Sequence, residues 1–489
     1  MNIAKWDMFE VKLTGPASGN PFVDVELSAR FMIENREVYT EGFYNGNGEY
    51  IVRLMPDMEG EWKYVTKSNA SELDGLNGSF TCTPAREGVL GPVRVATAVS
   101  SDMHRHSPAT RLAYADGTDY MCVGTTCYVW THQGDALEEQ TLETLSKGYF
   151  NKIRMCIFPK NYEFNKNEPE FYPFEGGMED DGSYDWDFNR FDIAYWTHLE
   201  KRIGQLMELG IEADLIIFHP YDRWGFSCMP RYVDYRYLRY MGARLAAFRN
   251  VWWSFANEYD LMPDKTMEDW DNYFKLVQQM DPSQHLRSIH NCRQFYDHSK
   301  PWVPHCSVQH SDMEKVPEWI KLYQKPVVID ECCYEGNIPN YWGNIPAEEM
   351  VNRMWESIVW GGYAGHGEPY LHPDDILWWA KGGVLHGQSP ERILFLRRIM
   401  SEMPADPTPY YERTRVVGLN YNYDKYLLYY GLRQSGIKIV NLPAGAQYKA
   451  EWIDTWNMTV EPVEGVFSGE GARIPMPSRS YVALRLTRI

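Results

Sequence analysis

Short apolar runs alternate with amphipathic helical stretches through the middle of the chain, and this rhythm constrains the fold more than any other feature. Eight such runs follow one another between about residues 105 and 403. Alternating strands and helices build a parallel sheet, and eight units over roughly 300 residues are typical of a closed barrel. The sequence therefore predicts the α/β class, with a (β/α)8 TIM barrel. The expected strands cover residues 120–128, 151–159, 211–220, 251–258, 286–291, 306–311, 326–331 and 361–368.

The segments between these strands carry helical periodicity. A helix is expected over residues 192–210, ending at Gly210, because glycine commonly stops a helix. Another is expected over residues 236–248. The stretch from 160 to 190 lacks that pattern, and we expect a long loop that walls a cleft.

The two ends of the chain have a different sequence pattern from the predicted barrel. Residues 4–98 consist of short alternating runs separated by Gly, Pro and Asn turns, which indicates an antiparallel β-sandwich of immunoglobulin type. Strand signals resume near residue 410 and predict a second antiparallel β-sandwich, with residues 405–414 as the linker. The expected domains are residues 1–98, 99–403 and 404–489.

Charge and composition narrow the choice of partner. The formal net charge of −19 argues against nucleic acid or an anionic membrane surface, since a polyanion gains nothing by meeting another. No run of about 18 apolar residues occurs, so no membrane span is expected. Aromatic residues make up 15% of the chain, and flat rings with polar tips suit the apolar faces of sugars. A neutral ligand such as an oligosaccharide fits these facts.

The N-terminal residues and the cysteines bear on location. The stretch MNIAKWDMFEVKL has no apolar core of a secretory signal. Nine cysteines, an odd number, lie in apolar segments, and we expect buried free thiols rather than a disulfide framework. A cytoplasmic protein is therefore predicted, although a secreted protein without its leader would look similar. Exposed flanking sandwiches are compatible with a homo-oligomer.

Carboxylates stand at the ends of two expected strands. Asn257-Glu258 ends the fourth and Asp330-Glu331 ends the seventh. Catalytic groups of such barrels sit where strands end, and two opposed carboxylates are what glycosidic hydrolysis requires. Because side chains alternate along a strand, we expect only one of Asp330 and Glu331 to face the barrel axis. We assign Glu331, the terminal member, with Asp330 as the alternative.

These segments resemble a known group of enzymes. VWWSFANEYD resembles the strand-four signature of clan A (β/α)8 retaining glycoside hydrolases, and KPVVIDECCYEG resembles their strand-seven segment. The domain order, WSFANE and GHGE make the whole chain similar to bacterial three-domain glycosidases with an apiosidase-like barrel. The resemblance implies that Glu258 is the acid/base, that Asn257 hydrogen-bonds the sugar 2-hydroxyl and that Glu331 is the nucleophile.

Further polar and aromatic residues accompany the glutamates. Arg154, inside the second strand, is expected to hold Glu331 ionised, as a strand-two Arg does in the clan, with a structural ion pair as the alternative. No metal site is expected, because no ligand motif such as HExxH is present, and no cofactor is implied. Other strand ends and loop aromatics are candidate substrate contacts, each with a structural role as the alternative. They are His219, His290, Asn291, His310, His366, Glu368, Trp130 and Trp378, with Tyr162, Phe164, Tyr221, Trp224 and Trp379 as further aromatic candidates.

The predicted function is that of a retaining glycoside hydrolase that cleaves O-glycosidic bonds of oligosaccharides by double displacement and is exo-acting. A transglycosidase would use the same carboxylates with a sugar as acceptor. A non-catalytic carbohydrate-binding protein would be expected to lack one carboxylate, whereas both are present. The identity of the sugar does not follow from the fold.

Overall fold

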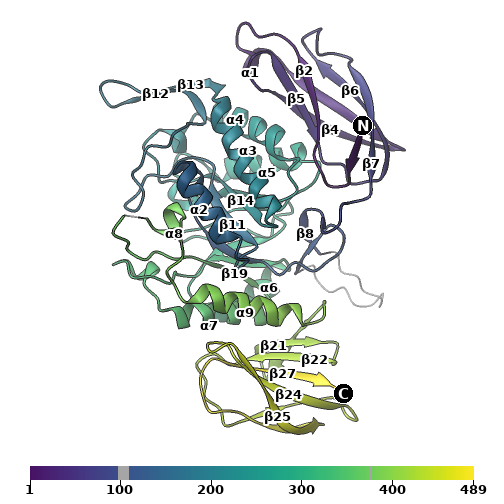
Figure 1. Ribbon diagram of the computed structural model, residues 1–489, viewed down its shortest axis with the longest axis vertical. Helices are drawn as coiled ribbons and strands as arrows, with labels where there is room; N and C mark the ends of the chain where they lie inside the picture. The colour runs from purple at the N-terminus through teal and green to yellow at the C-terminus, as the bar shows by residue number, and fades with distance from the viewer. Residues whose placement is uncertain (97–109, 375) are drawn as a thin grey trace.

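The computed structural model describes residues 1–96, 110–374 and 376–489, so the expected domain boundary at residues 98 and 99 lies outside the described residues. Figure 1 shows a central barrel with an N-terminal sheet at one end and a C-terminal sheet at the other. No helix within the described ranges is long and apolar enough to cross a membrane.

Eight parallel strands form the central sheet, in the order β16-β15-β14-β11-β10-β19-β18-β17. Side chains join the two ends of this order, because the Asn291 amide donates to the Gln309 carbonyl at 3.3 Å and accepts from the Gln309 N–H at 3.2 Å. All eight expected strands are confirmed, each within its predicted run. They are β10 (Val123–Thr126), β11 (Lys152–Cys156), β14 (Glu212–Phe218), β15 (Val251–Ala256), β16 (Arg287–Ser288), β17 (Cys306–Gln309), β18 (Val327–Glu331) and β19 (Tyr363–His366).

Helices cover the outside of this sheet. Helix α3 (Ile193–Glu208) begins where predicted, because the Asp192 side chain caps its first backbone N–H groups. Helix α4 (Arg231–Leu245) begins earlier than predicted, since the buried Val233 extends its buried face towards the N-terminus. Helix α5 (Met267–Met280) opens with a capping box between Thr266 and Asp269. The others are α2 (Asp135–Leu145), α6 (Val316–Tyr323), α7 (Ala347–Val359), α8 (Trp378–Lys381) and α9 (Ser389–Ser401).

The N-terminal sheet has the order β1-β7-β6-β3-β4-β5-β2, and all its ladders are antiparallel except β1 with β7. Burial alternates along β3, as expected for a strand with one face on a core, and Phe31 and Trp62 are fully buried there. The strands are β1 (Asn2–Ala4), β2 (Phe9–Thr14), β3 (Leu27–Ile33), β4 (Arg36–Tyr44), β5 (Glu49–Leu54), β6 (Gly60–Ser68) and β7 (Asn77–Thr83), and α1 (Pro21–Asp24) lies between β2 and β3. A short antiparallel pair, β8 (Val93–Val95) and β9 (Leu112–Tyr114), precedes the barrel.

Buried charges join the N-terminal sheet to the barrel. Arg53 of β5 donates to Glu200 of α3 at 2.8 Å and to the Arg244 carbonyl of α4 at 2.6 Å. Arg244 also donates to Glu200 at 2.7 Å. Burial raises the pKa of Glu200, but the two guanidinium groups outweigh burial and lower it. The carboxylate therefore stays ionised between two cations and fixes the sheet against the barrel.

The C-terminal region contains a six-stranded antiparallel sheet, β20-β21-β22-β27-β24-β25, and a separate pair, β23-β26. The expected linker at 405–414 is wrong, because β20 (Thr408–Glu412) lies within it and pairs with β21. The sheet packs on the barrel helices, where Tyr429 donates to Asn352 of α7 at 3.0 Å. The remaining strands are β21 (Arg415–Tyr421), β22 (Lys425–Tyr429), β23 (Ile437–Val440), β24 (Gln447–Asp454), β25 (Thr459–Ser468), β26 (Ala472–Pro475) and β27 (Val482–Arg488).

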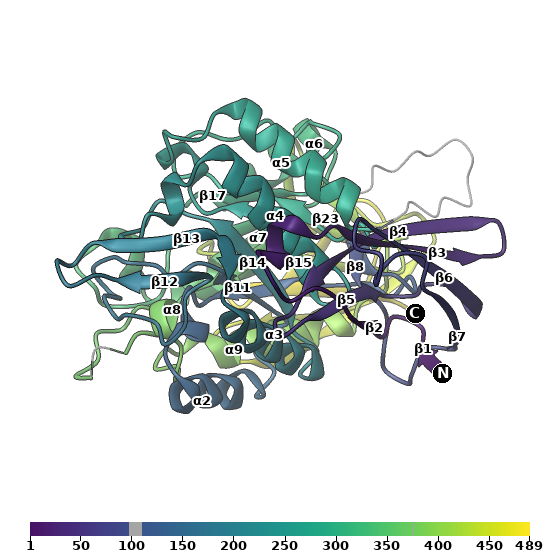
Figure 2. The ribbon, with the colours of Figure 1, turned by 90° about the horizontal axis from the view of Figure 1, so that it is seen from above.

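The segment after β11 is more ordered than a loop. Within residues 160–190, β12 (Phe174–Met178) and β13 (Tyr184–Phe191) form an antiparallel hairpin, so that part of the prediction was wrong. Figures 1 and 2 show the tip of the hairpin projecting away from the N-terminal sheet, while its base contacts that region, where Asn20 donates to the Asn189 carbonyl at 3.0 Å. The Trp186 indole donates to the Trp224 carbonyl at 2.7 Å and holds the hairpin to the loop after β14.

All nine cysteines are free. Seven are buried as predicted, whereas Cys228 is exposed and Cys292 is partly buried. The expectation that every thiol would be buried was therefore wrong for these two.

Replacing Glu200 tests the charged contact between the N-terminal sheet and the barrel. Glu200→Ala leaves two buried guanidinium groups without their shared partner, so the free energy of unfolding should fall by about 2–4 kcal/mol in urea denaturation. The control is Glu41→Ala, whose ion pair with Arg239 is half-exposed and should contribute less than about 1 kcal/mol. Equal losses in the two variants would contradict this account.

Candidate active site

The end of β18 contains a bulge that changes the direction of its carboxylates. Glu331 pairs with Gln309 of β17, and the register shift between these strands leaves Asp330 without a partner across the ladder. A bulge re-aims the side chains beside it. Both carboxylates therefore form ion pairs with side chains of β11. Asp330 lies 2.6 Å from Lys152, and Glu331 lies 3.1 Å from Arg154. The expectation that only one of the pair could face the barrel interior was wrong.

The Asp330 carboxylate is bound by neighbouring side chains below the mouth of the barrel. The Lys152 ammonium lies 2.6 Å from both Asp330 and Asp214, and Ser307 donates to Asp330 at 2.5 Å. Burial raises the pKa of Asp330, but Lys152 and Arg154 outweigh burial and hold it well below its usual range. Asp330 is thus a fixed buried charge, which leaves Glu331 as the carboxylate of β18 at the mouth.

Glu331 is 3% exposed and accepts hydrogen bonds from several groups. Tyr128 donates to its Oε1, Arg154 Nη1 lies 3.1 Å away and His290 Nε2 lies 3.4 Å away. Burial raises the pKa of this carboxyl, but His290, Arg154 and Tyr128 outweigh burial and lower it to about 2. Glu331 is therefore a carboxylate throughout the physiological pH range.

Glu258 follows β15 and has a different environment. Its φ of 55° lies in the left-handed region, which costs a non-glycine residue about 1–2 kcal/mol. The Tyr259 N–H donates to the His290 carbonyl at 3.0 Å and helps to hold this turn. The carboxylate, 7% exposed, accepts from Tyr221 and from Asn257 Nδ2 at 3.2 Å. No Lys or Arg forms an ion pair with Glu258 in the part of the chain that the structure describes.

Arg154 and Asn257 connect the two glutamates. Arg154 Nη1 donates to Asn257 Oδ1 at 2.7 Å and to Glu331 at 3.1 Å. Asn257 Nδ2 then donates to Glu258. The structure therefore brings together Glu258, Glu331, Asn257 and Arg154, in a continuous hydrogen-bonded chain.

Lys160 and two tyrosines complete this centre. Lys160 is 2% exposed, and its ammonium lies 3.3 Å from the Tyr128 ring centre, 4.2 Å from that of Tyr221 and 4.6 Å from that of Tyr162. None of the described residues accepts a hydrogen bond from this ammonium. Burial lowers the pKa of Lys160 to about 8. Sequence reasoning missed Lys160 and Tyr128, although both stand at strand ends, and it considered Tyr221 only for stacking.

The predicted polar strand ends divide into two groups. His290 contacts Glu331, and the His310 backbone N–H donates to the Glu331 carbonyl at 3.0 Å. His219 is buried with its Nε2 3.2 Å from a backbone carbonyl, and Asn291 joins β16 to β17. These last two contact neither catalytic candidate directly.

Two of the predicted tryptophans are buried, and a third stands at the site. Trp130 and Trp378 are buried, and their indole N–H groups bind Met155 at 3.4 Å and Thr125 at 2.9 Å, so neither presents a ring to a sugar. Trp379 is partly exposed instead, with its ring centre 5.8 Å from that of Tyr128. Trp379 is the better candidate for a wall of the site.

His366 and Glu368 do not face the two glutamates as substrate contacts would. Both are fully buried, and the Glu368 carboxylate accepts from the backbone N–H groups of His386 at 2.5 Å and Gly387 at 2.9 Å. Burial, with a smaller contribution from Glu335, raises the pKa of Glu368 to about 8. The structure contradicts the predicted substrate contacts, because these side chains bind protein groups behind the mouth.

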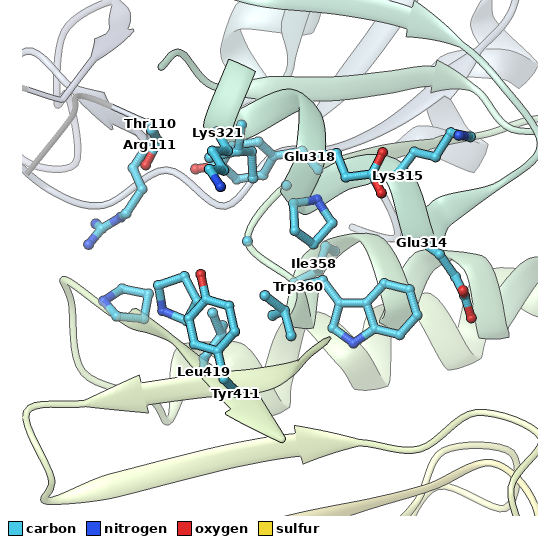
Figure 3. Close-up of a pocket in the computed structure, with 18 of the residues that line it drawn as sticks. Thr110, Arg111, Glu314, Lys315, Glu318, Lys321, Ile358, Trp360, Tyr411 and Leu419 are labelled. Carbon is cyan, nitrogen blue, oxygen red and sulfur yellow. The ribbon is translucent and has the colours of Figure 1, made fainter. Parts of the chain in front are cut away.

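A cavity also lies away from the two glutamates. A volume of about 720 Å³ opens between the barrel and the C-terminal sheet, with Arg111, Trp360 and Tyr411 in its lining, as Figure 3 shows. Its wall includes Tyr363 at the start of β19, so it lies at the N-terminal ends of the strands. Residues at that end of such a barrel usually serve stability. The site is therefore assigned by its carboxylates and not by cavity size.

Comparisons with known proteins agree with this geometry. The family model described as "Apiosidase-like, catalytic domain" matches residues 107–370, and two domains of unknown function, DUF5060 and DUF5605, match residues 2–69 and 415–487. A candidate glycoside hydrolase from Bacteroides vulgatus is 38% identical, covers 100% of both chains and has a TM-score of 0.93. A family 5 glycoside hydrolase from the same species, 16% identical with a TM-score of 0.60, covers 81% of this chain and 93% of its own and shares the fold. Among curated proteins, none matches this chain.

A parallel (β/α)8 barrel with two glutamates at its mouth, together with these similarities, defines a glycoside hydrolase. The chain belongs to the apiosidase-like family. Its β-rich flanking regions correspond to the two domains of unknown function.

Replacing Lys160 should change how stability depends on pH. The unfolded chain keeps this proton up to a pKa near 10.5, whereas the folded protein loses it at about 8, so burial of the charge costs stability below pH 8. Lys160→Met should raise the free energy of unfolding at pH 7 by about 1–3 kcal/mol, and the gain should shrink as the pH rises from 8 to 10.5. Urea denaturation at pH 7 and pH 10 measures both effects.

The exposed Lys147→Met serves as the matched control and should change stability by less than about 0.5 kcal/mol at either pH. A Lys160→Met protein with the same pH dependence as the parent would contradict the burial of a charged amine.

Proposed function

We propose that this chain is a retaining glycoside hydrolase in which Glu331 is the nucleophile and Glu258 is the acid/base. The supporting observation is the unequal environment of two linked carboxylates. Glu331 is surrounded by Arg154, His290 and Tyr128, whereas Glu258 accepts only from neutral groups. Environments that separate two carboxyl groups in this way assign one as the permanent anion and the other as the proton carrier.

The reaction follows from these positions. Glu331 attacks the anomeric carbon while Glu258 donates its proton to the leaving oxygen, and a covalent glycosyl-enzyme forms. Glu258, now a carboxylate, takes a proton from water, which displaces Glu331 and releases the sugar with retained configuration. Tyr221 donates to Glu258 in its ionised state and stabilises that second half of the cycle.

Asn257 is suited to a sugar hydroxyl. Its Oδ1 already accepts from Arg154, and one hydrogen of Nδ2 is directed to Glu258. An amide nitrogen carries two hydrogens, so one remains for the 2-hydroxyl of the sugar at the anomeric centre. Contacts to that hydroxyl strengthen in the transition state of glycosidases.

The low exposure of both glutamates favours exo-action on oligosaccharides. Both glutamates are less than 10% exposed, and Tyr162, Tyr221 and Trp379 stand around them. Such a pocket accepts a terminal sugar more readily than the middle of a polymer. We further propose an immunoglobulin-type sandwich over residues 1–98, the barrel over 99–403 and a C-terminal sandwich over 404–489. The antiparallel ladders support the two sandwiches. A cytoplasmic location and a homo-oligomer are also proposed.

Substitution of the two glutamates tests the assignment. Glu331→Ala should lose at least 10⁴-fold in kcat on an aryl glycoside because no covalent intermediate can form. Glu258→Ala should keep formation of the intermediate from an activated aryl glycoside and regain turnover with external azide, giving a glycosyl azide of retained configuration. Proton NMR of the first product reads the configuration, and a panel of pyranosides and furanosides identifies the sugar.

Normal turnover in Glu331→Ala, or an inverted first product, would contradict the proposal. Transfer of the glycosyl unit to added sugar in place of water would identify a transglycosidase. Binding of oligosaccharides without any turnover in the parent protein would indicate a carbohydrate-binding protein.

Tyr128 gives a separate prediction about pH. Tyr128→Phe removes one donor from Glu331, so the pKa of that carboxyl should rise from about 2, and the acid limb of kcat/KM should move up by about one pH unit. The matched control is Tyr162→Phe, whose hydroxyl has no partner among the described residues and whose profile should stay in place. An unshifted acid limb in Tyr128→Phe would show that this hydrogen bond does not govern Glu331.

A further inference from the structure

We infer that Glu335, His366 and Glu368 form a binding site for one divalent transition-metal ion, which the sequence did not predict. Each of the three offers one ligand atom, and these atoms lie within 4.8 Å of one another. The exposed fractions are 0%, 0% and 1%. This site is independent of the proposed reaction, and its ion would support the wall of the active site without taking part in chemistry.

The three ligands come from two neighbouring strands. Glu335 follows β18 by four residues, His366 ends β19 and Glu368 lies two residues further on. A Cβ atom added to Gly387 would lie 2.5 Å from an oxygen of both Glu335 and Glu368. The two carboxylates therefore converge on one point, and only a glycine fits between them and the chain.

No protein cation pairs with the carboxyl groups of this cluster among the described residues. Neither Glu335 nor Glu368 forms an ion pair with any Lys or Arg in the described ranges, and two buried carboxylates without a cation are costly. A second cluster, Asp135 with Glu138 and His198, has the same residue types but contains Arg202, which binds Glu138 at 2.6 Å and Asp135 at 2.5 Å. Arg202 already pairs with two carboxylates of that cluster, whereas no Lys or Arg of the described residues pairs with the first.

His366 supplies an independent indication of a ligand. Its Nδ1 lies 3.0 Å from Thr125 Oγ1, whereas its buried Nε2 has no hydrogen-bond partner among the described residues. A histidine that binds a metal usually donates its other ring N–H to an oxygen, which fixes the ring and leaves one lone pair for the ion. The Thr125 contact is such an arrangement, with Nε2 as the free nitrogen.

Backbone groups hold the carboxylates without saturating them. Glu368 accepts from the His386 and Gly387 N–H groups. Glu335 accepts from Gln388 at 2.8 Å and Ser389 at 3.1 Å, next to the start of α9, and from the Tyr370 hydroxyl at 3.0 Å. A carboxylate has about four lone-pair sites, so each can still ligate an ion. These hydrogen bonds orient the oxygens in advance.

The donor set selects the metal. Two carboxylates and one imidazole suit Zn²⁺, with Mn²⁺ as the next candidate, because Ca²⁺ and Mg²⁺ prefer sites made of oxygen alone. Water would complete the coordination. The Trp379 N–H donates to the Glu368 carbonyl at 3.2 Å, and its ring centre lies 5.3 Å from that of Tyr334, the residue before Glu335. An ion here would therefore fix both loops behind the aromatic wall.

Calorimetry on the full chain, freed of metal with EDTA, tests the site. Titration with ZnCl₂ should show one site per chain and raise Tm by several degrees, while CaCl₂ should do neither. Glu368→Gln should weaken Zn²⁺ binding at least tenfold, because a neutral amide replaces an anionic ligand. Asp135→Asn in the second cluster is the control and should leave Zn²⁺ binding unchanged.

Two results would overturn the inference. Absence of Zn²⁺ and Mn²⁺ binding to the parent would show that the cluster is not a metal site. Full Zn²⁺ affinity in Glu368→Gln would place the ion elsewhere. If that variant does not fold, anomalous scattering at the zinc edge from crystals of the parent decides whether an ion lies between His366 and the two carboxylates.

Discussion

Two cations on one strand allow the barrel to bury its acidic groups. Lys152 and Arg154 stand two residues apart on β11 and therefore point to the same side, into the barrel. Lys152 binds both Asp214 and Asp330, and Arg154 binds Glu331. A buried carboxylate without a partner would take up a proton and could no longer act as a nucleophile. The position of Glu331 therefore depends on β11 as much as on its own strand.

The parts of this structure that depend on local pattern were predictable. Strand length, apolar runs and a polar residue at the strand end are all properties of neighbouring residues, and they located all eight strands and both glutamates. Prediction failed where one extra residue changed the direction of a side chain. The bulge at Asp330 turns two adjacent carboxylates inwards, and strict alternation of side chains could not anticipate it.

The aromatic residues show the same limit more clearly. Trp378 and Trp379 are neighbours in the sequence, and nothing local distinguishes them, but the first is buried against Thr125 and the second stands at the mouth. Likewise, Tyr128 reaches Glu331 only because the barrel closes and brings β10 and β18 to the two sides of β19. Contacts between elements far apart in the chain decide these roles. The sequence could therefore indicate the kind of residue but not the individual one.

The centre as a whole has an uneven distribution of charge, and this explains why Lys160 sits where it does. Arg154 is bound by Glu331 and Asn257, so it contributes little positive charge to the neighbourhood of Glu258. Lys160 lies on the faces of Tyr128 and Tyr221, the tyrosines that donate to Glu331 and Glu258, and aromatic faces stabilise an ammonium without neutralising it. A cation over a phenol ring also makes its hydroxyl a stronger donor. One amine therefore strengthens the hydrogen bonds to both glutamates, while it forms no hydrogen bond with any described residue, and this offsets part of the stability that its burial costs.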